Sequence, residues 1–459
     1  MSTTVIQKEN KMAVMPEGKL LMNMALPLIA SMLVQALYNI VDSVYVSQYS
    51  ADAVTALGLA FPIQNLQIGF ATGVGVGVNA LLSRSLGEGQ KERGSRVAGN
   101  GIFLAGVVTV LFMLFGFFGA RPFFAMQSEN PATVNGGASY VSICCIFIAG
   151  IVFEVLFERM LQATGRTIYT LFTQGTGAVL NIILDPIFIF GVPELGIPEM
   201  GIAGAAIATV IGQWVAAILA LIFNITRNKD VSFRLSYLRP KWHLLKDILS
   251  IGVPSAIMMA IGAVMNFGIN HILQGFTEVA TGVFGIYYKI QSFFFMPLFG
   301  MNNACISIIA FNYGYRKPER IIRTLKITCT IAMGVMIAGL LTFQLAPHLL
   351  LNMFNPTEEF MQIGKVALRA ISWHFPVAAI AIALSSSFQA LGNGFYSTIV
   401  SLCRQLFALL PAAYLLSLTG YVDNVWWAFF IAEFVSLAVT VFLFIRIYRK
   451  KVRPLAQTI

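Results

Sequence analysis

The chain has 459 residues, of which 57% are apolar and only 11% are charged, and its mean hydropathy is +0.77. This composition excludes a soluble globular domain of the same length. The net charge of +10 raises the question of a nucleic-acid partner, but membrane topology and attraction to anionic lipid headgroups account for the basic residues. We therefore expect a membrane protein that binds no nucleic acid.

Apolar segments long enough to cross a hydrocarbon core of ~30 Å as helices follow one another along the chain. Twelve are expected, at residues 20–46, 54–83, 96–118, 134–158, 167–191, 201–224, 247–274, 279–309, 321–346, 361–392, 396–418 and 425–447. They are continuously apolar, whereas the strands of a membrane barrel alternate over about ten residues. The sequence therefore predicts an all-α membrane protein with twelve transmembrane helices.

The second half of the chain repeats the first at a constant offset of 227 residues. Matching positions include Pro27 and Pro254, Asn39 and Asn266, Gly58 and Gly285, Gln64 and Gln291, and Gln162 and Gln389. The repeat predicts two pseudo-symmetric six-helix lobes: an N-terminal lobe at 1–226, a cytoplasmic linker at 227–246 and a C-terminal lobe at 247–459. Two equivalent halves in a membrane protein are typical of transporters whose site lies between the halves.

The basic residues predict the orientation of the chain in the membrane. Of the 30 Lys and Arg residues, 25 lie at the two termini or in the connections 84–96, 159–166, 227–246 and 316–326. By the positive-inside rule these segments are cytoplasmic, so both termini are expected in the cytoplasm of a multi-pass inner-membrane protein. The polar segment before the first helix lacks a convincing small-residue cleavage site, and we expect no removed signal peptide.

Several familiar motifs are absent or misleading. The five cysteines and four histidines show no ligand spacing, and no metal site is expected. Gly73, Gly75 and Gly77 imitate a phosphate-binding loop, but no Gly-Lys-Ser/Thr follows, and close helix packing is the better interpretation. With no cofactor expected and no nucleotide site, transport would draw its energy from an ion gradient.

Ionisable side chains at membrane depth are costly, at about 2.5 to 3.5 kcal/mol each on insertion scales, and usually serve a function. The expected set is Asp42, Glu154, Asp185, Lys289 and Glu433. Asp42 and Asp185 fall at similar depth in their helices, and Asn181 precedes Asp185 by one helical turn. Two carboxylates and an amide can hold a proton or a sodium ion. The alternative is that both Asp residues end their helices at the outer interface.

Other polar residues and three prolines are also candidates for a role in transport. Lys289 either lines the central cavity or forms an ion pair with Glu433 or Glu154, and Glu158 is expected at the cytoplasmic interface. Prolines can bend membrane helices and free backbone carbonyls, and three are candidates: Pro27, Pro186 and Pro254. The possible substrate cavity includes Gln64, Asn266, Lys289 and Gln291, although interhelical hydrogen bonds are equally ordinary for the glutamines.

One stretch resembles a known family signature. The run Asn181-Ile-Ile-Leu-Asp185-Pro186-Ile-Phe-Ile-Phe190-Gly191, followed by Gly201-Ile-Ala-Gly-Ala-Ala-Ile-Ala-Thr209, resembles helices 5 and 6 of the multidrug and toxic compound extrusion (MATE) transporters. Leu-Gln162-Ala-Thr-Gly165-Arg, Phe-Gln389-Ala-Leu-Gly392-Asn and Ala-Leu-Pro27-Leu-Ile are similar to other family segments. The resemblance extends over the whole chain and is nearest to the bacterial group with MepA-like and DinF-like exporters.

The resemblance implies a V of two lobes and antiport of small organic compounds, often cationic or aromatic, against H+ or Na+. It assigns the N-lobe cation site to Asp42, Asn181, Asp185 and Thr209. In the NorM-like branch, carboxylates on helices 7 and 10 form a C-lobe site, but here helix 7 offers Asn266 and Asn270, which favours N-lobe coupling. We lean to the proton as the coupling ion and expect a monomer.

Three other functions are alternatives for a chain with this sequence. A flippase for lipid-linked oligosaccharides or lipids would share the helical architecture, but it usually adds helices and a basic cavity. A membrane-embedded enzyme would need a nucleophile, a metal or an acid–base set at the aqueous face, and none stands out in the sequence, so no enzymatic activity is expected. A channel would have no need for matched lobes.

Overall fold

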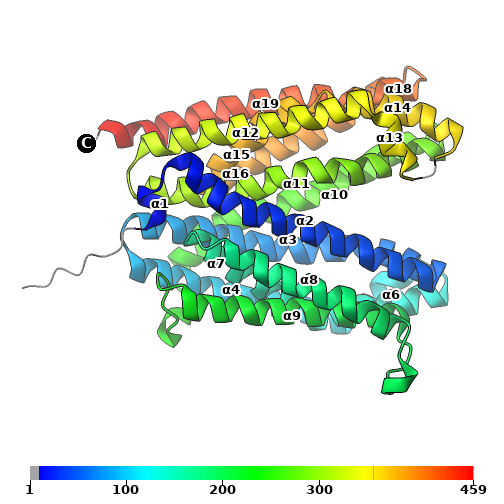
Figure 1. Cartoon of the computed structure of the whole chain (residues 1–459), viewed down its shortest axis with the longest axis horizontal. Coiled ribbons are helices and arrows are strands. Elements are labelled where there is room, and N and C mark those ends of the chain that lie inside the picture. The colour runs from blue at the N-terminus through cyan, green and yellow to red at the C-terminus, as the bar shows by residue number, and fades with distance from the viewer. Residues whose placement is uncertain (1–9, 355, 458–459) are drawn as a thin grey trace, which may run out of the picture.

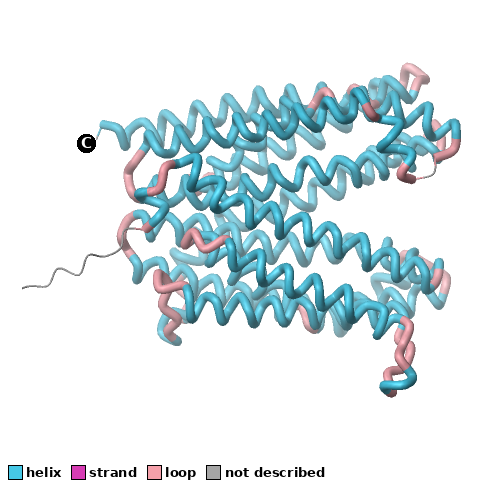
Figure 2. Tube along the Cα trace, in the orientation of Figure 1, coloured by secondary structure: helices cyan, strands magenta, loops and turns pink. Residues whose placement is uncertain are grey.

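The computed structural model describes residues 10–354 and 356–457, and this part of the chain is almost entirely helical. Most connections lie at the two ends of the bundle (Figure 2). Within the described residues, ten helices are long and apolar enough to cross a membrane, and two bent pairs raise the number of spans to as many as twelve. The predicted all-α membrane fold is confirmed.

The N-terminal lobe contains the helices that precede the central connection. They are α1 (Lys11–Val14), α2 (Glu17–Tyr49), α3 (Ala51–Gly87), α4 (Lys91–Phe118), α5 (Ala120–Ala125), α6 (Pro131–Ile146), α7 (Ala149–Ala163), α8 (Ile168–Ile189), the 3-10 turn η1 (Pro193–Leu195) and α9 (Gly201–Arg227). Within this lobe α2 contacts α8, α3 contacts α7, and α9 contacts both α7 and α8. The connection to the second lobe carries the short turn η2 (Leu235–Leu238).

The C-terminal lobe repeats this order. Its helices are α10 (Trp242–Gln274), α11 (Glu278–Gly314), α12 (Pro318–Leu345), α13 (Pro347–Asn352), α14 (Glu358–Ser372), α15 (Phe375–Ala390), α16 (Gly394–Leu402), η3 (Cys403–Leu409), α17 (Leu410–Ser417), α18 (Val422–Val425), α19 (Ala428–Ile447), η4 (Tyr448–Val452) and η5 (Arg453–Gln457). α2 and α10 have 33 residues each, α3 and α11 have 37, and α4 and α12 have 28. The equal lengths follow the offset seen in the sequence. The boundaries 1–226, 227–246 and 247–459 stay a prediction.

The two lobes meet along α2 and α3 on one side and α10 and α11 on the other. At one end of the bundle, where α1 and the end of α19 lie, the lobes are close together, and toward the other end they diverge (Figure 1). The first of these is the α1 end. A methyl group added at Gly73 of α3 would lie 2.6 Å from the carbonyl oxygen of Gly252 of α10, and one at Gly77 would meet Ile248. These glycines let the helices approach closely, which confirms the packing interpretation of Gly73 and Gly77.

Two predicted helices are wrong in detail. The segments 134–158 and 361–392 were expected as single helices, but each is a pair of helices, α6 with α7 and α14 with α15, bent by 45° and 46°. At the first bend the indole of Trp214 donates to the carbonyl of Phe147 at 3.1 Å, and at the second the ring of His374 contacts the carbonyl of Ile371 at 2.7 Å. Side chains that satisfy the freed carbonyls make such breaks tolerable inside a membrane.

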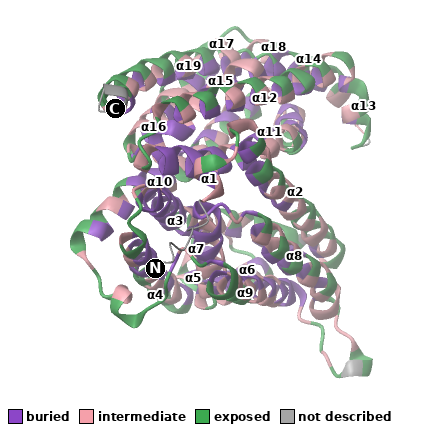
Figure 3. Ribbon diagram, turned by 60° about the vertical axis from the view of Figure 1, so that its left-hand side comes forward, coloured by how far each residue is buried: buried purple, intermediate pink, exposed green. Residues whose placement is uncertain are grey.

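Buried residues gather on α3 and α7 in the middle of the N-terminal lobe (Figure 3). In the candidate span of α3, 78% of the most apolar window is buried inside the protein, compared with 28% for α4. This part of α3 faces protein on most sides, whereas α4 presents most of its surface outward. Several polar residues of α3 and α7 therefore lie inside the lobe, among them Asn79, Glu158 and Gln162.

Candidate functional site

A polar cluster lies inside the N-terminal lobe, between α8 and α9. The amide of Asn181 donates to Oδ1 of Asp185 at 3.2 Å and contacts Oγ1 of Thr209 at 3.3 Å. Asp185 is fully buried and Asn181 is 3% exposed. The one-turn spacing of Asn181 and Asp185 places both side chains on the same face of α8, so the structure brings these three predicted residues together.

Asp42 of α2 faces the same cluster. It lies close enough to Asp185 for the two carboxylates to interact electrostatically. Three buried oxygens have no hydrogen-bond partner among the described residues: Oδ1 of Asp42, Oδ2 of Asp185 and Oδ1 of Asn181. Buried oxygens without donors are costly, and carboxylate and amide oxygens are the ligands that a proton or a small hard cation prefers.

A cavity of about 480 Å³ adjoins this cluster and includes Asn181 and Thr209 in its wall. Tyr38 and Gln35 line it from α2, at four and seven residues before Asp42. This spacing places all three on one face of α2, and it could have identified them from the sequence. Met259 of α10 and Phe299 and Asn303 of α11 close the cavity from the other lobe.

The cavity wall also carries charged residues of α7. Glu154, Glu158 and Arg159 line it. Glu158 lies beside Thr173 and Gln174 of α8, about three helical turns before Asp185. Glu158 is only 2% exposed and accepts hydrogen bonds from Thr173 at 2.5 Å and Gln174 at 2.8 Å. The expectation that Glu158 lies at the interface is therefore wrong, because α7 continues to Ala163 and turns this side chain inward.

The prolines lie inside continuous helices. Pro27 is within α2, Pro254 within α10 and Pro186 near the end of α8. The carbonyl of Pro186 accepts from the N–H of Phe190 at 3.2 Å, so α8 ends within one turn of the proline. The carbonyl of Pro254 accepts from the hydroxyl of Thr398 at 3.0 Å.

The residues expected in a shared substrate cavity are dispersed. Gln64 donates to the hydroxyl of Tyr140 at 2.7 Å, the interhelical bond that the sequence left open as an alternative. Lys289 is exposed and forms no ion pair within the described chain, and Asn266 and Gln291 are half-buried. None of these four residues lines the cavity of the N-terminal lobe.

Glu433 has a partner that the sequence did not suggest. Its carboxylate lies 3.7 Å from the guanidinium of Arg404 on η3, so the alternative in which Lys289 pairs with Glu433 is wrong. Arg404 was missing from the set of intramembrane charges, although residues 396–418 were expected to span the membrane. The signal in the sequence was that Arg404 falls inside a segment expected to span the membrane.

A family model described as MatE matches residues 27–187 and 254–415, which covers most of both lobes. The chain belongs to the MatE family. The two matched segments begin 227 residues apart, the offset of the internal repeat. The resemblance to the multidrug and toxic compound extrusion transporters is confirmed.

Relatives match over nearly the full length. The multidrug export protein MepA of Staphylococcus haemolyticus is 22% identical over 93% of this chain and 92% of its own length. A FAD transporter of Shewanella oneidensis is 24% identical and covers 89% of this chain and 90% of its own. A MATE transporter solved in an outward-facing conformation superposes with a TM-score of 0.90 at 24% identity, over 98% and 99% of the two chains.

Family membership makes this MatE chain a multi-pass membrane transporter with two lobes. The family implies small organic substrates and a place in the lipid bilayer. The transporter family agrees with the expectation of a non-enzymatic protein.

Proposed function

We propose that this chain is a multidrug antiporter, which exports organic compounds, often cationic or aromatic, in exchange for H+ or Na+. The observation that carries the proposal is the group of buried oxygens of Asp42, Asn181 and Asp185 without hydrogen-bond partners in the described chain. Such a group is expensive unless it binds a cation during the cycle. Thr209 completes the site by its contact with Asn181.

Coupling would arise because ion and substrate favour different states of the same lobe. In the outward-open state the site takes its cation, α2 bends near Pro27, and the cavity loses its affinity for the exported compound. In the inward-open state the cation leaves and the affinity returns. A coupling free energy of about 1 to 3 kcal/mol is the usual scale for such linkage. We favour the proton, because two adjacent carboxylates at low dielectric readily share one.

The charge of the cavity supports an organic cation as substrate. Glu154 and Glu158 outnumber Arg159 in its wall, and the aspartates lie at its margin. A lipophilic cation gains from aromatic and apolar walls and from the carboxylates together. The name of the staphylococcal relative, a multidrug export protein, supports the same class.

A second candidate is an aromatic compound that carries phosphate. The Shewanella relative is named a FAD transporter, and Lys289 is an exposed cation on α11 without an ion-pair partner in the described part of the chain. Lys289 is also the feature that keeps a flippase for lipid-linked oligosaccharides or lipids as an alternative.

For each of these functions we propose a monomer in the inner membrane, with both termini in the cytoplasm and without a cofactor.

The test is ethidium efflux from reconstituted vesicles, with proton and sodium gradients imposed separately. The Asp42→Asn variant should lose gradient-driven efflux, whereas Asp52→Asn should keep it, because Asp52 is exposed at the start of α3 and bonds to Asn130 at 2.9 Å. If only one of the two gradients drives efflux, that ion is the coupling ion. Full efflux in Asp42→Asn would remove the N-lobe site from the mechanism. If the folded wild-type protein exports neither ethidium nor FAD, a lipid flippase becomes the better function.

A further inference from the structure

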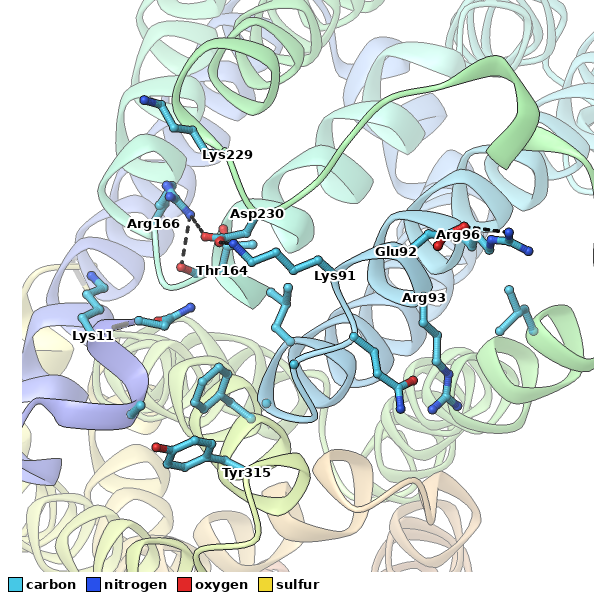
Figure 4. A pocket seen from close by; sticks show the side chains of 18 of the residues that line it. Lys11, Lys91, Glu92, Arg93, Arg96, Thr164, Arg166, Lys229, Asp230 and Tyr315 are labelled. Atoms are coloured by element: carbon cyan, nitrogen blue, oxygen red, sulfur yellow. Dashed lines mark hydrogen bonds and ion pairs between the residues drawn. The ribbon is translucent and has the colours of Figure 1, made fainter. Parts of the chain in front are cut away.

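A second and larger hollow lies at the α1 end, away from the N-lobe cavity. Its volume is about 1490 Å³. It is lined by α1, the first turns of α4, the loop before α8, the connection between the lobes and the end of α11; its charged lining residues are Lys11, Lys91, Glu92, Arg93, Arg96, Arg166, Lys229, Asp230 and Lys241. Both lobes therefore contribute to one basic pocket (Figure 4).

The acids of this pocket are already engaged. Glu92 binds Arg96 at 2.7 Å, while Asp230 accepts from Arg166 at 2.8 Å and lies 3.2 Å from Lys91. Figure 4 shows Lys91 and Arg166 directed at Asp230 from opposite sides. Arg93 reaches Glu88 at 3.0 Å. Lys11, Lys229 and Lys241 have no acidic partner within the described residues, so the pocket keeps an excess of positive charge.

α1 lies where the two lobes meet at the α1 end, a contact called the joint between the lobes, so the positive charge of the pocket acts on that contact. Arg320 of α12 donates to the carbonyl oxygens of Met15 at 2.6 Å and Met12 at 3.3 Å, and lies 3.4 Å from Glu17. These bonds tie α1 to the C-terminal lobe. Lys11 of α1 nevertheless lies beside Gly165, in the loop of the N-terminal lobe that carries Arg166.

Two cations therefore face each other across the joint. Burial is the larger cause that lowers the pKa of Lys11, and the positive charge of Arg166 is the second. The lysine also donates to Oδ1 of Asn23 at 2.9 Å, which does not neutralise it. An anion between these side chains would replace repulsion by attraction on both sides of the joint.

We propose that this pocket binds a phosphate group between Lys11, Arg166 and Lys229, and that the bound group stabilises the contact of the two lobes at the α1 end. Phosphate fits because it accepts several charge-assisted hydrogen bonds at once from Arg and Lys. The headgroup of an anionic phospholipid and a soluble phosphate compound both offer this chemistry. The site is separate from the cation site and does not depend on the proposed antiport.

The experiment uses the full chain in nanodiscs of phosphatidylcholine and measures the apparent melting temperature. In one arm phosphatidylglycerol replaces part of the neutral lipid, and in the other inorganic pyrophosphate is added, with sodium chloride at equal ionic strength as reference. Ligand that binds only the folded state raises its stability. We expect a rise of about 2 to 4 °C in at least one arm, and the responding arm identifies the source of the phosphate.

Two triple variants with the same loss of charge decide whether the pocket is responsible. The pocket variant is Lys11→Gln, Lys229→Gln and Lys241→Gln. The control variant is Arg323→Gln, Lys326→Gln and Lys450→Gln, three exposed residues outside the pocket lining. The rise should disappear in the pocket variant and persist in the control. If the pocket variant misfolds, the single change Lys229→Gln should halve the rise.

Three outcomes would overturn the proposal. The first is no rise in either arm for the wild-type chain. The second is an equal loss in both triple variants, since a diffuse surface charge would then explain the effect. The third is a rise that survives in the folded pocket variant.

Discussion

The two lobes share helix lengths and order, but their interiors differ. The N-lobe cavity is lined by Ile68, Gly177 and Ala178. At the offset of 227 residues the C-terminal lobe has larger side chains, Phe295, Arg404 and Gln405. Phe295 is 7% exposed and packs edge-on against Phe375 with ring centroids 5.5 Å apart. At these three positions the N-terminal lobe thus has smaller side chains beside its cavity than the C-terminal lobe has at the equivalent positions.

The charges differ in the same way. Asp42 corresponds to Ile269, and Glu154 and Glu158 of α7 correspond to Ala381 and Ser385 of α15. The C-terminal lobe instead buries Glu433 beside the guanidinium of Arg404 at 3.7 Å. The buried carboxylate of the C-terminal lobe thus has a fixed cation beside it, whereas Asp42 and Asp185 form no ion pair within the described residues. The proposed exchange of a cation is therefore assigned to the N-terminal lobe.

The largest expected effect concerns Asp185. Asp185→Asn keeps the size of the side chain but removes a carboxylate from the proposed cation site, so gradient-driven ethidium efflux should fall by about 100-fold, near the upper end of ordinary coupling. Efflux from vesicles under an imposed gradient measures it. Ser436→Ala, at the C-lobe position equivalent to Thr209, is the control and should leave efflux unchanged. Equal losses in the two variants would end the functional distinction between the lobes.

A smaller effect is expected for Glu158, at the other end of the cavity. Glu158→Gln retains a side chain that can bond to Thr173 and Gln174 but removes the charge. The affinity for organic cations should drop, and efflux at low ethidium concentration should fall by about 10-fold. Saturating ethidium should restore most of the rate, which a defect in ion coupling would not allow. The matched C-lobe change, Ser385→Ala, should affect neither regime.

Much of this organisation was readable in the sequence, because apolar segments of membrane length and a constant repeat offset depend on composition and spacing. The bends at Phe147 and His374 were not predicted. At the first bend the carbonyl partner, Trp214, comes from α9, and only the tertiary structure defines that contact. At the second the partner is local, His374 with the carbonyl of Ile371, but the surrounding residues are mostly apolar and were expected to form one continuous helix. Glu158 was misplaced because its neighbour Arg159 suggested an interface. The grouping of Asn181 with Asp185 follows helical spacing, whereas the approach of Asp42 from α2 could be argued only from depth and resemblance.

The ion pair of the C-terminal lobe should matter for stability more than for coupling. Glu433→Gln leaves the half-buried guanidinium of Arg404 without its carboxylate, which should cost about 1 to 3 kcal/mol. The apparent melting temperature, followed with a thiol-reactive dye on the buried cysteines, should fall while gradient-driven efflux persists. Removing both charges, with Arg404→Met and Glu433→Leu, should recover most of the loss. Abolished coupling in a stable Glu433→Gln protein would instead make the C-terminal lobe part of the cation machinery.

The smallest effect is expected at the joint between the lobes, where Lys11 has a lowered pKa because of burial and the charge of Arg166. Between the folded-state pKa and the usual value near 10.5, the unfolded chain binds more protons at this lysine than the folded chain does. Stability therefore rises with pH across that window, and below it the charged lysine retains its full cost. Lys11→Met should remove this rise and, at neutral pH, leave the protein as stable as the wild type or slightly more so. Melting temperatures measured across alkaline pH for both chains test the difference, with Lys326→Met as an exposed control that keeps the rise. A loss of stability at neutral pH in Lys11→Met would mean that the hydrogen bond of Lys11 to Asn23 outweighs the repulsion between Lys11 and Arg166. Lys11 would then stabilise the contact of the two lobes at α1 instead of weakening it.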